Sequence, residues 1–218
     1  MTHIVELRIA ADPADWQRAG FDVDGQGMGR IGTVSLRLDP AFGRPGLRSW
    51  ALLGARDGGT TDVDGVPTEH VGAPLATPSP TADAARGGIG ALLIDHIVIG
   101  TPDLARTVDA VESSLGLPVL RIRDSDTYGA VMRQAFFRLG EVILEVVGGQ
   151  EPDPQGGPAR FYGIAVTVAD LDAACAHLGP LVGASKAAVQ PGRHIATIRR
   201  EAGLAARVAL MSAEPTRP

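Results

Sequence analysis

A histidine and a glutamate, each inside a short apolar stretch, are the residues of this sequence best suited to chemistry. His96 lies in the segment IDHIVIG and Glu145 lies in VILEVV. Apolar stretches of this length are typical of buried strands, in which successive side chains point to opposite faces. Because a carboxylate is costly to bury without a partner, something must satisfy Glu145. In the simplest case His96 or an arginine does so.

These residues belong to an internal repeat. The segment His96–Leu104 (HIVIGTPDL) recurs over Gly163–Leu171 as GIAVTVADL and, more faintly, over Arg8–Trp16 as RIAADPADW. In each copy a strand leads into a turn with an aspartate that can serve as the N-cap or first-turn anion of a helix. The aspartates are Asp15, Asp103 and Asp170. Further strand-like runs follow each helix, so the repeated unit is predicted to be βαβββ.

This repeat resembles the vicinal oxygen chelate superfamily, which contains glyoxalase I, methylmalonyl-CoA epimerase, extradiol dioxygenases and bleomycin-type resistance proteins. The resemblance is clearest from Ile94 to Met211. It implies an α+β fold in which two βαβββ modules form a curved, mixed sheet of eight strands around a groove that holds the site. Since the same fold hosts several reactions, the resemblance specifies the architecture better than the chemistry.

The repeat and the composition divide the chain into four parts. Residues 91–148 and 160–213 are predicted to be glyoxalase-like modules A and B of one domain, 91–213. Residues 57–90 are rich in Gly, Pro, Thr, Ser and Asp and are predicted to be a linker whose second half is poorly packed. Residues 1–56 resemble a degenerate third module. An unpaired module leaves an open sheet edge, so it packs either on the other two modules or on a second chain, which gives a possible homodimer.

The resemblance implies half of a metal site. In metal-dependent members each module supplies a histidine from its first strand and a glutamate from its last. Module A has both, as His96 and Glu145, but the matching positions of module B are Gly163 and Ala209. Two protein ligands bind one divalent ion, such as Mn, Fe, Ni or Zn, only weakly, because catalytic sites usually provide three ligands and a water. Restoring both missing ligands should tighten metal binding.

Arginine and aromatic side chains are expected to line the rest of the groove. Arginine in a partly desolvated site binds carboxylate or phosphate through paired hydrogen bonds, which predicts a small anionic or aromatic ligand. The residues predicted to contact it are Gln134, Phe136, Arg138, Tyr162 and Arg193. The alternative for each arginine is a solvated face or an ion pair. Tyr162 and His194 are candidates for a missing metal ligand, although Tyr162 is one residue out of phase with Gly163.

Composition excludes several other classes of function. The net charge is −5 and the chain has a single lysine, so nucleic acid is not an expected partner. No apolar run approaches the length of a membrane span, and the first residues lack a signal-peptide pattern, which predicts a cytoplasmic protein without a membrane partner. The single cysteine, Cys175, is interpreted as a core or helix-surface thiol rather than a nucleophile.

Two functions remain open at this stage, and the sequence does not decide whether the protein is an enzyme. The first is a binding protein of the resistance type, metal-free or weakly metallated, that sequesters or senses a small molecule. The second is a metal-dependent lyase, isomerase or dioxygenase in which Glu145 holds the ion or transfers a proton. Loss of two of the four ligand positions favours the first function, whereas His96 and Glu145 keep the second open.

Overall fold

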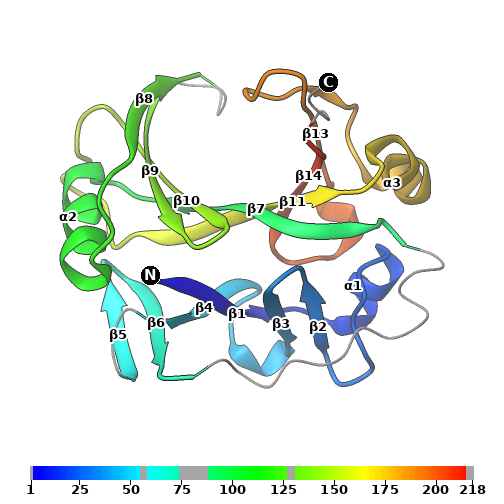
Figure 1. Ribbon diagram of the computed structural model, residues 1–218, viewed down its shortest axis with the longest axis horizontal. Coiled ribbons are helices and arrows are strands. Elements are labelled where there is room, and N and C mark those ends of the chain that lie inside the picture. The colour runs from blue at the N-terminus through cyan, green and yellow to red at the C-terminus, as the bar shows by residue number, and fades with distance from the viewer. Residues whose placement is uncertain (1, 55–57, 74–87, 127–130, 215–218) are drawn as a thin grey trace. The chain divides into compact units, whose positions relative to one another are not determined.

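A computed structural model describes residues 2–54, 58–73, 88–126 and 131–214 (Figure 1). Its strands form a six-stranded sheet, in the order β2-β3-β1-β4-β6-β5, and an eight-stranded sheet, in the order β12-β13-β14-β11-β7-β10-β9-β8. Both sheets contain parallel and antiparallel pairs. The predicted α+β fold with mixed sheets is confirmed.

The eight-stranded sheet consists of the two predicted βαβββ modules. Module A comprises β7 (Ala91–Gly100), α2 (Leu104–Leu115), β8 (Arg121–Ser125), β9 (Met132–Leu139) and β10 (Val142–Gly148). Module B comprises β11 (Arg160–Val168), α3 (Leu171–Leu178), β12 (Lys186–Ala187), β13 (His194–Thr197) and β14 (Arg207–Ser212), with short 3-10 turns at Gly179–Leu181 and Arg200–Ala202. In each module the first strand pairs in parallel with the last.

The aspartates of the repeat start the helices. Asp103 caps α2 by accepting a hydrogen bond from the Arg106 backbone N–H at 3.1 Å, and Asp170 caps α3 by accepting one from that of Ala173 at 2.9 Å. Asp15 lies in the first turn of α1, where the positive end of the helix dipole stabilises its negative charge. Both predicted roles of these aspartates therefore occur.

The six-stranded sheet is formed by residues 3–71. In chain order its elements are β1 (His3–Ala10), α1 (Pro13–Arg18), β2 (Met28–Ile31), β3 (Val34–Leu38), a 3-10 turn (Pro40–Phe42), β4 (Gly46–Leu53), β5 (Gly59–Val63) and β6 (Val66–Val71). Read outward from its centre, the strand order is β1-β3-β2 on one side and β4-β6-β5 on the other. The segment thus holds two shortened copies of the repeat, so a homodimer no longer follows from an unpaired module.

Strands β5 and β6 correct the boundary of the predicted linker. Both lie within residues 57–90, and they pair antiparallel across a two-residue turn, Asp64–Gly65. Asp64 and Gly65 have φ values of 52° and 92°, as both central residues of a type I′ hairpin require. The glycines and threonines that suggested a linker are compatible with this hairpin because Val63 and Val66 bury its inner face. The part of the predicted linker at 74–87 lies outside the described residues.

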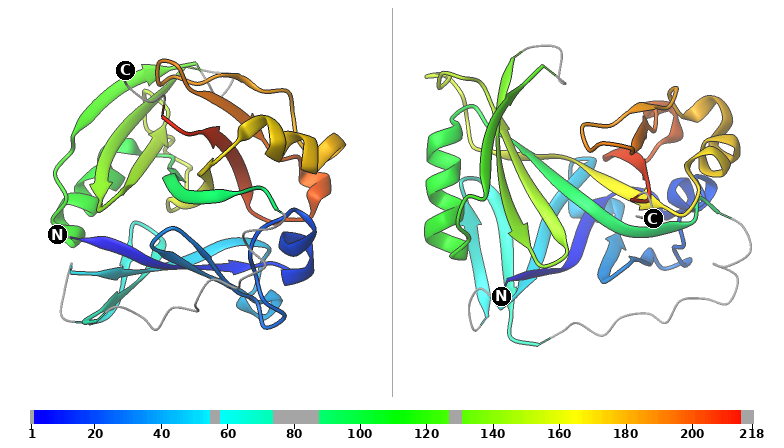
Figure 2. Two further views of the ribbon diagram at one scale, coloured as in Figure 1. Left: turned by 45° about the vertical axis from the view of Figure 1, so that its right-hand side comes forward. Right: turned by 45° about the horizontal axis from the view of Figure 1, so that its top comes forward.

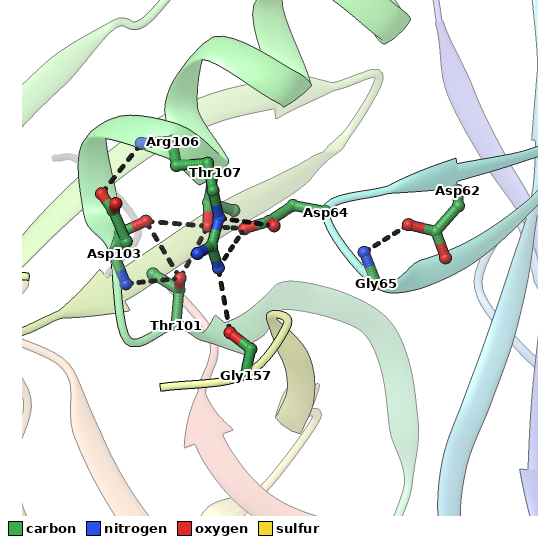
Figure 3. Close-up of polar contacts among 8 residues, drawn as sticks. All are labelled: Asp62, Asp64, Gly65, Thr101, Asp103, Arg106, Thr107 and Gly157. Atoms are coloured by element: carbon green, nitrogen blue, oxygen red, sulfur yellow. Dashed lines mark hydrogen bonds and ion pairs between the residues drawn. The ribbon is translucent and has the colours of Figure 1, made fainter. Parts of the chain in front are cut away.

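The tip of this hairpin is fixed to the start of α2 (Figure 3). The Asp64 carboxylate accepts hydrogen bonds from Arg106 Nε at 2.7 Å and Arg106 Nη2 at 3.2 Å, and another from the hydroxyl of Thr107. Thr107 is fully buried, and its hydroxyl also contacts Thr101 Oγ1 at 2.6 Å. The hydrogen bond from Arg106 to Asp64 raises the pKa of the guanidinium. A segment predicted to be the first half of a linker therefore contributes a carboxylate to the packing of α2.

The chain divides into two compact units, each assembled from three separate stretches. One comprises Met1–Glu6, Arg48–Leu75 and His96–Tyr162, and the other comprises Leu7–Leu47, Ala76–Asp95 and Gly163–Pro218. In the first unit α2 packs against β9, β10 and β5 (Figure 2). The buried residues of this helix, Thr107, Val111 and Leu115, follow one another at four-residue intervals.

The strands of module A present one apolar face. Leu144 lies opposite Ile97 on one side and Phe137 on the other, and all three are fully buried. Because side chains alternate along a strand, the residues between them point to the opposite face. That opposite face carries His96 and Glu145.

Candidate functional site

Four polar residues of module A share one face of its sheet and lie along a diagonal that crosses four neighbouring strands. Glu145 lies opposite Val98, which is two residues beyond His96. On its other side Glu145 lies opposite Phe136, which is two residues beyond Gln134. Gln134 in turn lies directly opposite Arg123. The diagonal therefore consists of His96 on β7, Glu145 on β10, Gln134 on β9 and Arg123 on β8.

Consecutive members of this diagonal make direct contacts. The side-chain amide of Gln134 donates a hydrogen bond from Nε2 to Glu145 Oε1 at 2.5 Å, and both residues are buried. Arg123 Nε donates to Gln134 Oε1 at 2.7 Å. Because arginine can only donate, it fixes the orientation of the amide: the oxygen faces Arg123 and the NH₂ group faces Glu145. The guanidinium of Arg123 also lies over the Phe136 ring, 5.1 Å from its centroid.

His96 approaches the far oxygen of the same carboxylate. His96 Nε2 is 4.0 Å from Glu145 Oε2, which is an ion-pair distance but too long for a hydrogen bond. The His96 side chain is 18% exposed and that of Glu145 only 7%. The expectation that a partner satisfies Glu145 is therefore met by Gln134, which sequence analysis assigned to ligand contact. The sequence feature that indicated a role for Gln134 was its position on the same strand face as Phe136 and Arg138.

The register shows which residues of module B occupy the equivalent positions. In module A, Glu145 lies opposite the residue two beyond His96, and in module B, Ala209 lies opposite Ala165, which is two beyond Gly163. Gly163 and Ala209 thus stand where a second His and Glu would be. A Cβ atom at Gly163 would lie 2.5 Å from the backbone oxygen of Arg207, which is closer than real Cβ atoms approach. The backbone of β14 therefore closes this position to a side chain.

The donor set does not fit a four-ligand metal centre. Within residues 2–54, 58–73, 88–126 and 131–214, no three His, Cys, Asp or Glu side chains lie together as a metal-binding group. Module A offers one imidazole and one carboxylate, and an oxygen of that carboxylate already accepts a hydrogen bond from Gln134. Such a pair provides half of the ligands that a tightly held divalent ion needs.

Arg193, predicted to contact the ligand, lies in a buried network of protein hydrogen bonds. Its Nη1 donates to Asp95 Oδ2 at 2.6 Å, its Nη2 to Thr167 Oγ1 at 2.9 Å, and its Nε to the backbone oxygen of Ser212 at 2.9 Å. The Arg193 side chain is only 6% exposed. All three nitrogens have protein acceptors, which favours a structural role that ties the end of β14 to the strand residue preceding His96.

The other residues predicted from sequence differ in exposure. Phe136 is half-buried, and Arg138 is exposed on the face that carries His96, opposite Ile143 on β10. Tyr162 is 41% exposed and directly precedes Gly163 on β11. Arg123, which sequence analysis missed, contacts both Gln134 and Phe136. Its strand, RIRDS, has too little apolar character to indicate which face carries the polar diagonal.

The single cysteine, Cys175, was predicted to be a core or helix-surface thiol rather than a nucleophile. Burial and the nearby Asp172 raise the pKa of the Cys175 thiol, which disfavours the thiolate and agrees with an unreactive cysteine.

None of the helices in the described parts of the chain is long and apolar enough to cross a membrane.

Comparison with known proteins identifies the class. Residues 93–197 match the family described as the Glyoxalase/Bleomycin resistance protein/Dioxygenase superfamily. This segment, which contains His96 and Glu145, is similar to members of that superfamily. The resemblance inferred from the repeat is confirmed. No curated protein matches the chain.

Solved structures extend the similarity to the whole chain. A mutant form of 4-hydroxymandelate synthase from Streptomyces coelicolor has a similar fold, with a TM-score of 0.66 and 11% identity over 100% of this chain and 94% of that chain. Methylmalonyl-CoA epimerases from Mycobacterium tuberculosis and Streptomyces coelicolor also match, each with a TM-score of 0.47. Their identities are 18% and 20%, over 58% and 59% of this chain and 91% and 99% of theirs. At these identities the similarity concerns the fold alone.

Proposed function

We propose that the protein binds a small anionic or aromatic molecule on the face of module A that carries His96 and Glu145. The observation that carries this proposal is the hydrogen bond from Gln134 to Glu145. It gives the buried carboxylate a protein donor, so Glu145 does not depend on a metal ion for a partner. Half-buried Phe136 and exposed Arg138 then remain as an apolar surface and a cation available to a ligand.

Screening of a small-molecule library by ligand-observed NMR tests this proposal. The library contains neutral, aromatic and anionic compounds, and each hit is measured again on Phe136→Ala and His96→Ala. Hits that weaken in both variants support the proposal, because both side chains lie on the proposed face. Hits that bind these variants and the natural protein equally, or a complete lack of hits, would overturn it.

A second function is a metal-dependent lyase, isomerase or dioxygenase. It is favoured by the 4.0 Å separation of His96 Nε2 and Glu145 Oε2, which places two potential ligands side by side. A divalent ion at this pair would act as a Lewis acid toward a substrate oxygen. Metal analysis of the purified protein separates the two functions, since an enzyme of this kind needs a stoichiometric ion.

We further infer a cytoplasmic protein without a nucleic-acid or membrane partner. The net charge of −5 and the single cysteine support this inference. Cell fractionation tests the location, and light scattering tests whether the protein is a homodimer.

A further inference from the structure

We propose that Arg123 is the anion-binding residue of this face and that the ligand is a small carboxylate. The inference rests on the proposed function and adds the ligand's class and the residue that selects it. Three observations support it: the fixed orientation of Arg123, the two nitrogens that it leaves available, and the charge of the surrounding face.

The Arg123 guanidinium is oriented by two neighbours. Its Nε donates to Gln134 Oε1 at 2.7 Å, and its guanidinium carbon Cζ lies over the Phe136 ring, 5.1 Å from the ring centroid. Gln134 is itself held by Glu145. A side chain fixed in this way has already lost much of the rotational freedom that an arginine gives up when it binds a ligand.

The remaining edge of Arg123 is available to a ligand. Among the described residues, neither Nη1 nor Nη2 of Arg123 has a hydrogen-bond partner, and the residue is half-buried on strand β8. Two parallel N–H groups at one edge match the two oxygens of a carboxylate, which they bind in a bidentate manner. Partial burial strengthens such a pair because water competes less for both partners.

The charge on this face also favours an anion. Arg121 on β8 lies opposite Phe136, and Arg138 on β9 is two residues beyond it, so that arginines surround the ring on one side of the sheet. Among the strand residues of β7 to β10 that share this face, Glu145 is the only carboxylate. Its Oε1 already accepts from Gln134. The face therefore carries more positive than negative charge.

A neighbouring arginine on the opposite face provides a matched contrast. Arg133 donates from Nε and Nη2 to the two oxygens of Asp124 at 2.8 and 3.2 Å, an internal bidentate ion pair that lowers the pKa of Asp124. Arg123 has the same chemistry, but its second edge has no such protein partner among the described residues. We infer that a carboxylate of the ligand fills the role that Asp124 has for Arg133.

Fluorine NMR titration with para-fluorobenzoate tests the inference. The neutral para-fluorobenzamide and inorganic phosphate serve as comparison probes, and the variants are Arg123→Gln, Arg123→Lys and the matched control Arg133→Gln. We expect fluorobenzoate to bind the natural protein and Arg133→Gln within two-fold of each other. Arg123→Gln should weaken binding about ten-fold or more, and Arg123→Lys should also weaken it, because lysine keeps the charge but loses the paired donors. Melting temperatures confirm that each variant is folded.

Several outcomes would overturn the inference. These are fluorobenzoate binding that Arg123→Gln leaves within two-fold of the natural protein, equal binding of the neutral amide, tighter binding of phosphate, or no binding of fluorobenzoate at millimolar concentration. Library hits that depend on Phe136 and His96 but not on Arg123 would leave the proposed function standing while this inference fails. A library without hits overturns the proposed function itself.

Discussion

The side-chain amide of Gln134 donates a hydrogen bond to Glu145 Oε1 at 2.5 Å. The second oxygen of this carboxylate faces His96, at 4.0 Å. Gln134, which was predicted to contact the ligand, thus stabilises Glu145, which was predicted to bind a metal ion. The polar face of module A is consequently organised by a protein hydrogen bond, with Arg123 holding the amide from the other side.

Removing the amide should destabilise the protein through the buried carboxylate. For Gln134→Leu we expect a loss of about 2 kcal/mol in the free energy of unfolding, because Glu145 loses a donor within the sheet. Urea denaturation measures this loss. The double variant Gln134→Leu/Glu145→Leu should be more stable than the single one, since it leaves no buried carboxylate without that donor. Arg138→Gln, at an exposed position, should stay within about 0.5 kcal/mol of the natural protein.

Metal content should be substoichiometric after purification. His96 and Glu145 supply two ligands, and affinity should be far weaker than at a four-ligand site. We expect elemental analysis to find well under one divalent ion per chain and His96→Ala to change that value little. We also expect no glyoxalase activity on the glutathione hemithioacetal. Full occupancy by an ion that resists dialysis, and that His96→Ala removes, would instead establish the metal-dependent function.

The sequence was sufficient to predict the modules but not the contacts on their faces. The repeat around Asp103 and Asp170 predicted both βαβββ modules, because each cap and each strand alternation depends on neighbours in the chain. The contacts of Gln134 and Arg193 depend on strand register between distant segments. Strand composition does not determine that register.

In the six-stranded sheet, composition alone also failed to reveal two strands. Hairpin β5–β6 was hidden because its glycines and threonines are also typical of linkers. Its Asp64–Gly65 turn was nevertheless a recognisable signal, since Asp-Gly is one of the dipeptides that two-residue hairpin turns favour.

Asp64 should contribute to stability although it lies in the predicted linker. Asp64→Ala removes an acceptor shared by Arg106 and the buried Thr107, and we expect the melting temperature to fall by about 4 °C. Asp124→Ala is the matched control, because it breaks an ion pair in which both partners are about 40% exposed. That control should lower the melting temperature by about 1 °C or less. Equal effects in both variants would contradict a specific role for the Asp64 contact.

Introducing a histidine at Gly163 should fail to complete the metal site. The resemblance to metal-dependent relatives suggested that Gly163→His with Ala209→Glu would tighten metal binding. In the structure, however, a Cβ atom at Gly163 would lie 2.5 Å from the backbone oxygen of Arg207 and 2.8 Å from the Cβ atom of the same arginine. A backbone atom cannot move aside as a flexible side chain can, so the strand pair must separate.

We therefore expect Gly163→His to lower the free energy of unfolding by about 2 kcal/mol, and Gly163→Ala to account for a large part of that loss. Ala209→Glu alone serves as the comparison for metal binding. The double variant should bind a divalent ion no more tightly than Ala209→Glu does, as measured by calorimetric titration with Zn²⁺. A stable double variant with stoichiometric, tightly bound metal would show that β14 can shift at Arg207 and that a second ligand pair can form in module B.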